Sequence, residues 1–305
     1  MHKDLVSVII PTFNRPITLE RAINSVLNQT YAKLEVIIVD DNNPNTEARV
    51  ETEQLMKKYE KNSKVKYVKH EYNKNGSAAR NTGFKHSSGE FIMFLDDDDE
   101  FLPCKAEVQV KCLKEHDFSW GACYTKYKRI KDGKIDTVCG ESREGNLYFD
   151  ELCRNLFIQA GSNLMVRREA FESIGGFNEK FQRNQDIEFA VRLLKRYKLA
   201  YVDEMGLIYH RYMLSEKKKF DMEKITKYYL ENFKEEISNL TIQDKKRFYN
   251  IINLQLFRYK IIVRKDIKSG LAMLFRREVT VLNAIRYIFH LLRRKILKKS
   301  YGFRL

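Results

Sequence analysis

The chain has 305 residues, of which 43% are hydrophobic and 32% are charged, so it can bury a core and is not disordered by composition. No run of about 18 apolar residues occurs, which excludes a membrane-spanning helix, and the first residues lack the layout of a signal peptide. The net charge of +15 is unevenly placed, because residues 1–210 hold 32 basic and 32 acidic side chains whereas residues 211–305 hold 24 and 9. A neutral body with a basic end indicates a body that carries chemistry and an end that docks on an acidic partner.

Short apolar strands alternate with helices through the first hundred residues. The expected strands are 5–10, 34–39, 65–69 and 91–95, and the expected helices are 17–27, 46–59 and one from the loop 73–77 to about residue 85. Because the strands are apolar almost without interruption, we expect both of their faces to be buried. The pattern therefore predicts an α/β fold, a Rossmann-like α/β/α sandwich around a mostly parallel central sheet.

The second part of the chain has a different character. Strands and turns are expected over 118–150, followed by a strand at 159–167, helices at 169–174 and 186–197, and a strand at 199–202. After Ser215 the sequence is helical, rich in Lys and Arg, and devoid of Pro. We place a soft boundary near 212–220, which divides the chain into a body, 1–212, with halves of about 1–100 and 101–212, and a helical basic region, 213–305.

Polar clusters follow three of the expected strands at the point where each strand should end. They are Thr12-Phe13-Asn14 after the first strand, Asp40-Asp41 after the second, and Asp96 to Asp99 after the fourth. In open parallel sheets, ligands bind beyond the carboxyl ends of the strands. The coincidence of three clusters at one edge predicts a binding site there.

The four consecutive aspartates, Asp96 to Asp99, are the sharpest local feature. Adjacent carboxylates raise one another's pKa, which a solvated acidic loop could tolerate and a divalent cation would relieve. In an extended segment Asp96 and Asp98 would point the same way and could face a metal, and their hard oxygens suit Mg²⁺ or Mn²⁺. Asp97 and Asp99 would then stabilise the loop or hold the metal ligands in position.

Other candidate residues have two interpretations each. Asp40 and Asp41 are typical of an Asx turn, but at a strand end they could also accept a bond from a nucleobase or a ribose. Arg80 is either a surface side chain or a partner for a phosphate or an acid. Asp186 opens an amphipathic helix, where the helix dipole alone favours an acid, and His210 is either a core histidine or a metal ligand.

Seven segments, in order over about residues 5 to 210, resemble those of family 2 glycosyltransferases, which have the GT-A fold. They read VSVIIPTFNR, SVLNQTY, LEVIIVDDNN, NGSAARNTGF, SSGEFIMFLDDDDEFLP, GSNLMVRREAFESIGGFNE and NQDIEFAVRL. The resemblance implies an enzyme that moves a sugar, with inversion, from a nucleotide-diphosphate sugar to an acceptor hydroxyl. The expected nucleotide is UDP, and the expected acceptor is a glycan or a lipid-linked oligosaccharide in cell-surface polysaccharide synthesis.

The resemblance also implies which residues carry the reaction. The donor-nucleotide residues it implies are Pro11, Phe13, Asn14, Asp40, Asp41, Arg80 and Asp97. Asp96 and Asp98 correspond to the metal-binding DxD pair, with His210 as a further ligand of Mn²⁺ or Mg²⁺, and Asp186 corresponds to the general base. The acceptor should lie over 161–186, where Arg167 and Arg168 either meet an acceptor phosphate or form a solvated surface pair.

The last residues, 279–305, contain no acid and predict an amphipathic helix. Its apolar residues recur at three- or four-residue steps: Leu282, Ile285, Phe289, Leu292 and Ile296. Such a stripe fits a helix that lies on an anionic membrane surface, and it also fits a helix packed on the rest of the chain or on a second subunit. With the membrane interpretation we expect a cytoplasmic protein, peripheral on the inner face of the cell membrane.

Two other classes of protein remain as alternatives. A sugar nucleotidyltransferase would be expected to carry a Gly-rich loop with Lys or Arg after the first strand, where this chain reads PTFNRP, residues 11–16. A nucleic-acid-binding protein would need basic residues interleaved with aromatics on a binding face, and the neutral charge of residues 1–210 argues against it.

Overall fold

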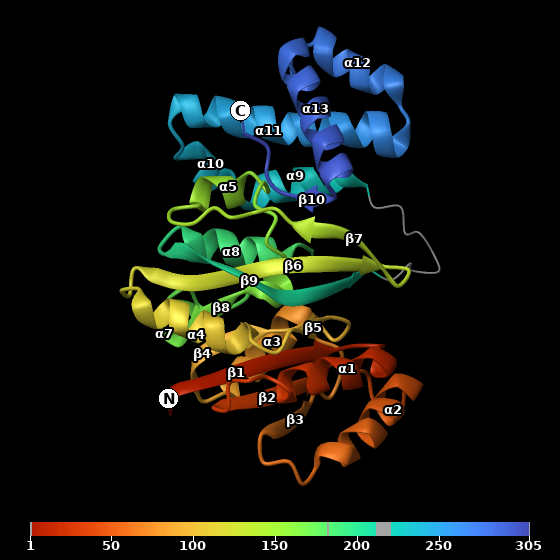
Figure 1. Ribbon diagram of the computed structural model, residues 1–305. Coiled ribbons are helices and arrows are strands. Elements are labelled where there is room, and N and C mark those ends of the chain that lie inside the picture. The colour runs from red at the N-terminus through yellow and green to blue at the C-terminus, as the bar shows by residue number, and fades with distance from the viewer. Residues whose placement is uncertain (1, 182, 212–220, 305) are drawn as a thin grey trace. The chain divides into compact units, whose positions relative to one another are not determined.

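The computed structural model describes residues 2–181, 183–211 and 221–304, which form two compact units (Figure 1). Unit 1 contains Met1–Leu152 and Leu156–Tyr212, and unit 2 contains Cys153–Asn155 and Met213–Leu305. The boundary expected near 212–220 lies outside the described residues.

Unit 1 is built on one large sheet. Its strands are β1 (His2–Thr12), β2 (Leu34–Asp40), β3 (Val65–Lys69), β4 (Gly89–Phe94), β5 (Glu100–Phe101), β6 (Trp120–Lys131), β7 (Lys134–Cys139), β8 (Met165–Arg167) and β9 (Lys198–Arg211). The order is β7-β6-β8-β4-β1-β2-β3, with β9 parallel to β6 and also paired with β5. Strands β3, β2, β1 and β4 are parallel, whereas β8 runs antiparallel to both of its neighbours.

Helices cover both faces of this sheet, as the apolar strands predict. They are α1 (Pro16–Leu27), α2 (Glu47–Met56), α3 (Gly76–Lys85), α4 (Lys105–Glu115), α5 (Tyr148–Leu152), α6 (Ala160–Asn163), α7 (Arg168–Ser173) and α8 (Gln185–Leu194). Helices α1, α2 and α4 share a core with one set of strand residues, and α3, α7 and α8 share a second core with the alternate set. In β1, for example, Val8 and Ile10 belong to the first core and Ile9 to the second.

We expected residues 159–167 to form a single strand, and this prediction is wrong for the first half of the segment. Gln159 has a left-handed backbone, with φ 57°, and the four-residue helix α6 follows before β8 begins at Met165. The side chain of Asn163 explains the break, because its amide donates to the backbone oxygens of Ile158 and Thr125. An asparagine whose side chain bonds to the backbone in this way competes with regular strand pairing.

Unit 2 is helical, as its composition predicts. Its elements are α9 (Met222–Asn232), α10 (Lys234–Ser238), α11 (Ile242–Arg258), a π-helical turn (Tyr259–Arg264), α12 (Ile267–Phe275), α13 (Val281–Leu297) and the two-residue β10 (Lys299–Ser300). Apolar residues of α11, α12, α13 and the C-terminal segment, including Leu254, Met273, Tyr287 and Phe303, form a small core. Among the described residues, no helix has the length and hydropathy needed to cross a membrane.

Arg49 of α2 holds the end of β2 in place. Its guanidinium is buried and lies 3.0 Å from the carboxylate of Asp40, and it donates to the backbone oxygens of Asp40, Asn42 and His70. Removing one partner of a buried ion pair leaves the other charge without compensation. This residue therefore fixes the strand end from which the site is built.

We expect Arg49→Met to lower the free energy of unfolding by about 3–5 kcal/mol, because Asp40 then stays buried without its cation. Urea denaturation measures this loss. The matched control is Lys58→Met, which removes an exposed ion pair with Glu20 and should cost less than about 1 kcal/mol. Equal losses in the two variants would contradict the structural role of Arg49.

Candidate active site

A cleft of about 370 Å³ opens at the carboxyl ends of β1, β2 and β4. It is lined by Pro11, Thr12, Phe13, Arg15, Asp41, Asn73, Asn75, Gly76, Ala79, Arg80, Asp96, Asp97 and Gln185. The structure thus brings six of the predicted donor and metal residues into one cleft: Pro11, Phe13, Asp41, Arg80, Asp96 and Asp97. Asn14, Asp40, Asp98 and His210 are not among the lining residues.

Asp41 organises the loop that forms one wall of this cleft. One of its carboxylate oxygens lies 2.7 Å from His70 Nδ1 and accepts the backbone N–H of Lys74. The other accepts the side-chain amide of Asn73 and the backbone N–H of Asn75. The carboxylate is buried and makes four bonds to the chain itself, so it holds the 73–75 loop against the end of β2.

Asp40 holds the loop after β1 in place through Asn42. It is fully buried, and besides Arg49 its carboxylate accepts the hydroxyl of Tyr67 at 2.5 Å and both N–H groups offered by Asn42. The side-chain oxygen of Asn42 in turn accepts the backbone N–H of Asn14. In this structure Asp40 and the backbone of Asn14 therefore join the loop after β1 to the loop after β2, through Asn42.

Arg80 meets an acidic neighbour, one of the two partners considered for it. It is buried in α3, its Nη2 lies 2.5 Å from Asp96 Oδ1, and its guanidinium lies over the ring of Phe177. It also donates to the backbone oxygen of Gly76. The cation is thereby fixed directly beside the first carboxylate of the acidic run.

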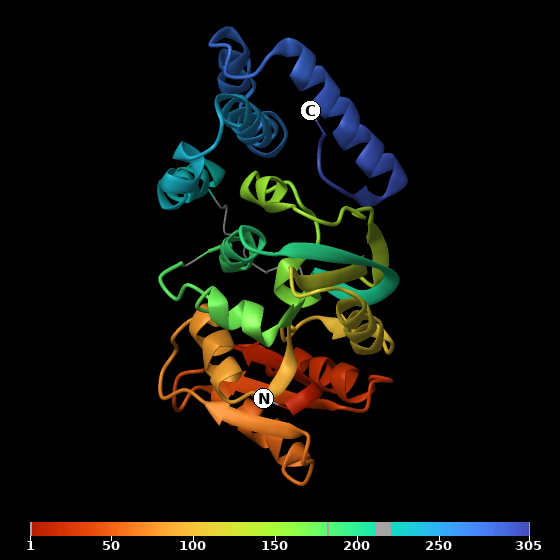
Figure 2. The same cartoon turned by 90° about the vertical axis from the view of Figure 1, so that its left-hand side faces the viewer.

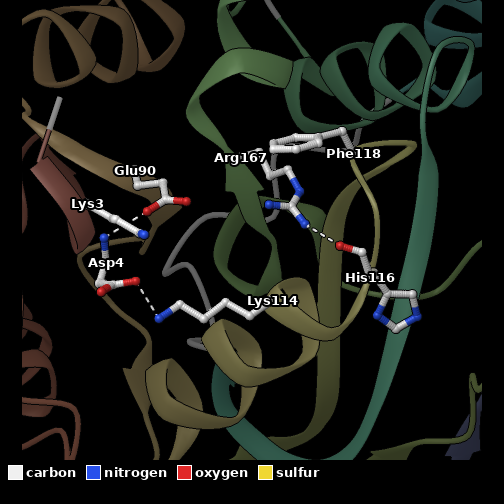
Figure 3. A pocket seen from close by; sticks show the side chains of 7 residues that line it. All are labelled: Lys3, Asp4, Glu90, Lys114, His116, Phe118 and Arg167. Carbon is white, nitrogen blue, oxygen red and sulfur yellow. Dashed lines mark hydrogen bonds and ion pairs between the residues drawn. The ribbon is translucent and has the colours of Figure 1, made fainter.

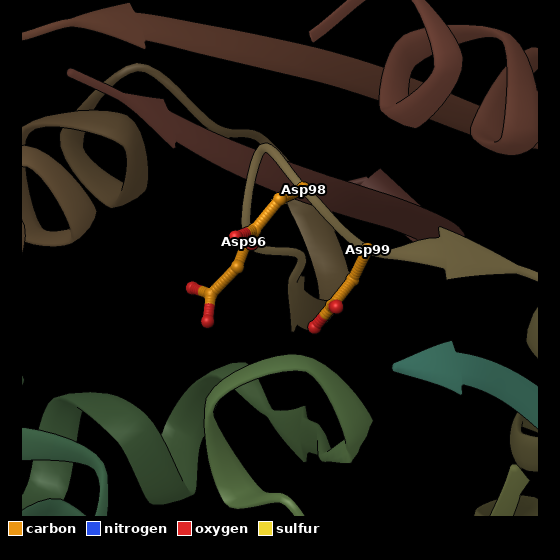
Figure 4. Close-up of side chains that lie close together, drawn as sticks. All are labelled: Asp96, Asp98 and Asp99. Carbon is orange, nitrogen blue, oxygen red and sulfur yellow. The ribbon is translucent and has the colours of Figure 1, made fainter. Parts of the chain in front are cut away.

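The acidic run forms a tight turn and not an extended segment (Figure 4). The backbone N–H of Asp99 donates to the oxygen of Asp96 at 3.0 Å, with Asp97 and Asp98 at the centre of the turn. Alternation of side chains applies only to extended backbone, so it does not decide which carboxylates share a side. Carboxylate oxygens of Asp96, Asp98 and Asp99 lie within 4.8 Å of one another.

The two central aspartates are held by Arg15. Asp97 is buried and accepts the Thr12 hydroxyl, the Phe13 backbone N–H and Arg15 Nη1. Burial raises the pKa of Asp97 to about 7, although the positive charge of Arg15 opposes the shift. Asp98 also lies against Arg15, at 2.7 Å, and burial again raises its pKa.

Asp99 is the member of the cluster that the sequence analysis left out of the metal ligands. It is 1% exposed, one of its oxygens accepts the backbone N–H of His210, and the other has no hydrogen-bond partner in the described part of the chain. Burial and the charges of Asp96 and Asp98 raise its pKa well above the usual range, although the Ser162 hydroxyl and the His210 N–H oppose the shift. A buried carboxylate beside two further carboxylates could bind a hard divalent cation.

His210 does not join this group of carboxylates. It lies within β9, and its Nε2 is 2.5 Å from a carboxylate oxygen of Glu100 on the paired strand β5. The described geometry thus links its imidazole to Glu100, and we do not include it among the proposed metal ligands.

Asp186 stands at the start of α8, close to Asp96. A methyl group built on Gly161 would lie 3.4 Å from Asp96 Oδ2 and 4.0 Å from Asp186 Oδ2, so the two carboxylates border the same small space. Removal from water raises the pKa of Asp186, Arg80 lowers it, and Asp96 raises it further. A carboxylate with a raised pKa at the edge of this cleft could act as a general base.

A buried polar network fixes the helix that carries Gly161. Lys105, fully buried at the start of α4, donates to the hydroxyl of Thr125 and to both oxygens of Asn163. The hydroxyl of Ser162 then accepts the backbone N–H of Asp96. The sequence gives little signal for this role, because a lysine near a helix start is usually exposed.

Arg167 and Arg168 were expected either on the surface or at an acceptor phosphate, with the surface pair preferred, and the surface interpretation is wrong. Both are buried. Arg167 donates to backbone oxygens of Leu113, His116 and Trp120, and Arg168 donates to that of Gly89. Their guanidinium groups therefore join segments of unit 1 that are distant in the sequence.

A second hollow, of about 440 Å³, opens at the amino ends of β1 and β4 (Figure 3). Four of its charged side chains pair with one another or with the backbone: Lys114 with Asp4, Glu90 with the backbone N–H of Asp4, and Arg167 with the oxygen of His116. These contacts give the four side chains a structural role, at the edge of the sheet opposite to the acidic turn.

Comparison with known proteins identifies the family of this chain and its fold. The model of glycosyl transferase family 2 matches residues 7–175, so the chain belongs to this family of glycosyltransferases. The fold is GT-A-like: a crystal structure of Staphylococcus aureus TarS 1-349 in complex with UDP-GlcNAc superposes with a TM-score of 0.63 at 18% identity, covering 86% of this chain and 74% of that one.

Two relatives show how far the sequence similarity extends. The Escherichia coli protein UDP-Glc:alpha-D-GlcNAc-diphosphoundecaprenol beta-1,3-glucosyltransferase WfgD is 30% identical over 212 residues, which are 70% of this chain and 78% of that protein. An uncharacterized glycosyltransferase of Rickettsia bellii is 39% identical over 145 residues, 47% of this chain. The chain spans only 20% of the length of that second relative.

Lys105 should make stability depend on pH. Burial lowers its pKa from 10.5 to about 7, so the unfolded chain binds more protons than the folded chain between these two values. The free energy of unfolding should therefore rise from pH 7 toward pH 10, by at most about 1.4 kcal/mol per pH unit, and Lys105→Met should remove this component. Urea denaturation of both proteins at several pH values measures the difference. If the free energy of unfolding depended on pH in the same way in both proteins, Lys105 would not lose its proton in the folded chain at these pH values.

Proposed function

We propose that this chain is an inverting glycosyltransferase whose reaction takes place between Asp96 and Asp186. The observation that carries this proposal is that the carboxylates of Asp96 and Asp186 both lie within about 4.0 Å of the position a Cβ on Gly161 would occupy, at the edge of the sheet where such folds bind ligands. Asp186 takes the proton from the acceptor hydroxyl as that oxygen attacks the anomeric carbon. Positioned base catalysis of this kind typically contributes about 10²–10⁴-fold to the rate.

Asp96, Asp98 and Asp99 are proposed to hold the divalent cation, Mn²⁺ or Mg²⁺. The burial of Asp99 and the short distances between oxygens of the three carboxylates, all within 4.8 Å of one another, support this set. The cation, when bound, supplies positive charge for the diphosphate leaving group. Arg80 keeps Asp96 in position, and Arg15 fixes Asp98 and keeps Asp97 against the loop after β1.

The donor is proposed to be a UDP-sugar, and the acceptor a lipid-linked oligosaccharide. The name of the E. coli relative, a UDP-Glc-dependent enzyme that acts on a diphosphoundecaprenol-linked sugar, supports both assignments. Pro11, Phe13 and the loop that Asp41 organises line the cleft at the ends of β1 and β2, where the nucleoside would lie. With such an acceptor, the enzyme would work at the cytoplasmic face of the cell membrane.

Asp186→Asn should abolish sugar transfer while leaving UDP binding unchanged, because the amide keeps the shape of the carboxylate but cannot accept the proton. Product formation from UDP-sugars and a thermal shift with UDP and Mn²⁺ measure the two properties. The control Asp203→Asn changes an exposed aspartate and should transfer sugar at the wild-type rate. Retained transfer by Asp186→Asn would refute its role as the base.

The raised pKa of Asp186 also predicts the pH dependence of the wild type. As the pH falls, its rate of sugar transfer should begin to decline at a higher pH than an ordinary aspartate would give.

Asp99→Asn should weaken Mn²⁺ binding at least about tenfold, because the site loses an anionic ligand at a buried position. Isothermal titration with Mn²⁺ in the presence of UDP measures the affinity. Asp132→Asn, a change of an exposed aspartate in the β6–β7 turn, is the control and should bind as wild type. Wild-type affinity in Asp99→Asn would remove this residue from the ligand set.

A further inference from the structure

Helix α12 of unit 2 exposes a whole apolar face. Ile267, Leu271 and Phe275 recur every four residues, so they lie on one side of the helix, and all three are exposed, Phe275 to 87%. The opposite side, with Met273, packs into the core of unit 2. The exposed face is therefore not needed to hold α12 in place.

Helix α13 has the same arrangement over a greater length (blue in Figure 2). Its inner side places Ala284, Tyr287 and Leu291 in or against the core of unit 2. The apolar stripe found in the sequence, which is Leu282, Ile285, Phe289, Leu292 and Ile296, is exposed along its whole length, with Phe289 at 66% and Ile296 at 79%. In the described structure this stripe has no core to fill.

Exposed basic residues lie on the same two helices and on the segments that flank them. The exposed basic residues of the two helices and their flanks are Lys268, Arg276, Arg277, Arg286, Arg293, Lys295, Lys298 and Lys299. The acids from residue 265 onward are Asp266, whose carboxylate caps α12, and Glu278, which lies 4.0 Å from Arg276. A partner for this surface must therefore be apolar in its interior and anionic at its boundary.

We propose that the α12–α13 surface, defined by the two apolar stripes and the basic residues that flank them, docks on an anionic lipid bilayer. The stripes would enter the boundary between headgroups and acyl chains, and the long basic side chains would reach the lipid phosphates. A bilayer accepts convex helix faces without a matching shape. A symmetric second copy would bring the same basic residues of both chains together, which the like charges oppose.

Co-sedimentation with vesicles tests the proposal on the full chain. Wild type should bind vesicles of phosphatidylcholine with 30% phosphatidylglycerol, and bind vesicles of phosphatidylcholine alone at least tenfold more weakly. The double variant Phe275→Ser/Phe289→Ser should lose at least tenfold in affinity for the anionic vesicles. Both side chains are exposed, so the double variant should keep the wild-type Tm.

Ile242→Ser is the matched control, because it changes an exposed apolar residue of unit 2 on α11, outside the proposed surface. It should bind the anionic vesicles as wild type does. Equal vesicle binding by wild type and the double variant would overturn the proposal. The proposal would also be overturned if wild type bound neither type of vesicle but formed a dimer in light scattering, while the double variant was monomeric.

Discussion

The structure depends on one electrostatic constraint, the placement of four consecutive carboxylates, Asp96 to Asp99, at the end of a buried strand. Three different parts of unit 1 stabilise them. Asp96 is held by Arg80 of α3, Asp97 and Asp98 by Arg15 before α1, and Asp99 by the backbone of β9. The acidic turn thereby joins both halves of unit 1, and its carboxylates of Asp96, Asp98 and Asp99 lie close enough together for the cation proposed above.

The rest of the site follows from this turn. Burial raises the pKa values of Asp97, Asp98 and Asp99, which opposes full ionisation of the turn, while Arg15 favours the ionised forms of Asp97 and Asp98. Asp186 is placed beside the same turn, and Ser162 bonds to its first residue. The proposed metal ligands and the proposed base therefore lie close together, and Lys105 fixes the helix α6 beside them through its bonds to Asn163.

The sequence predicts the sheet well and the site in part. Strands such as β2 were predictable because burial on both faces leaves an almost uninterrupted apolar run, and the family motifs located the cleft. The role proposed for Asp99 could not be predicted, because it depends on a turn that cancels the alternation of an extended segment. Lys105 and Arg167 were equally hidden, since their partners are backbone and side-chain oxygens far away in the sequence. The apolar stripe of α13 was visible in the sequence, but only the structure distinguishes its exposed side from its buried one.

The most direct test of the account is anomalous diffraction from a crystal grown with Mn²⁺ and UDP. The account predicts one strong manganese peak within bonding distance of carboxylate oxygens of Asp96, Asp98 and Asp99, about 2.0–2.3 Å, with the diphosphate on its open side. A UDP molecule bound without manganese at the acidic turn, or a peak at another group of residues, would contradict it.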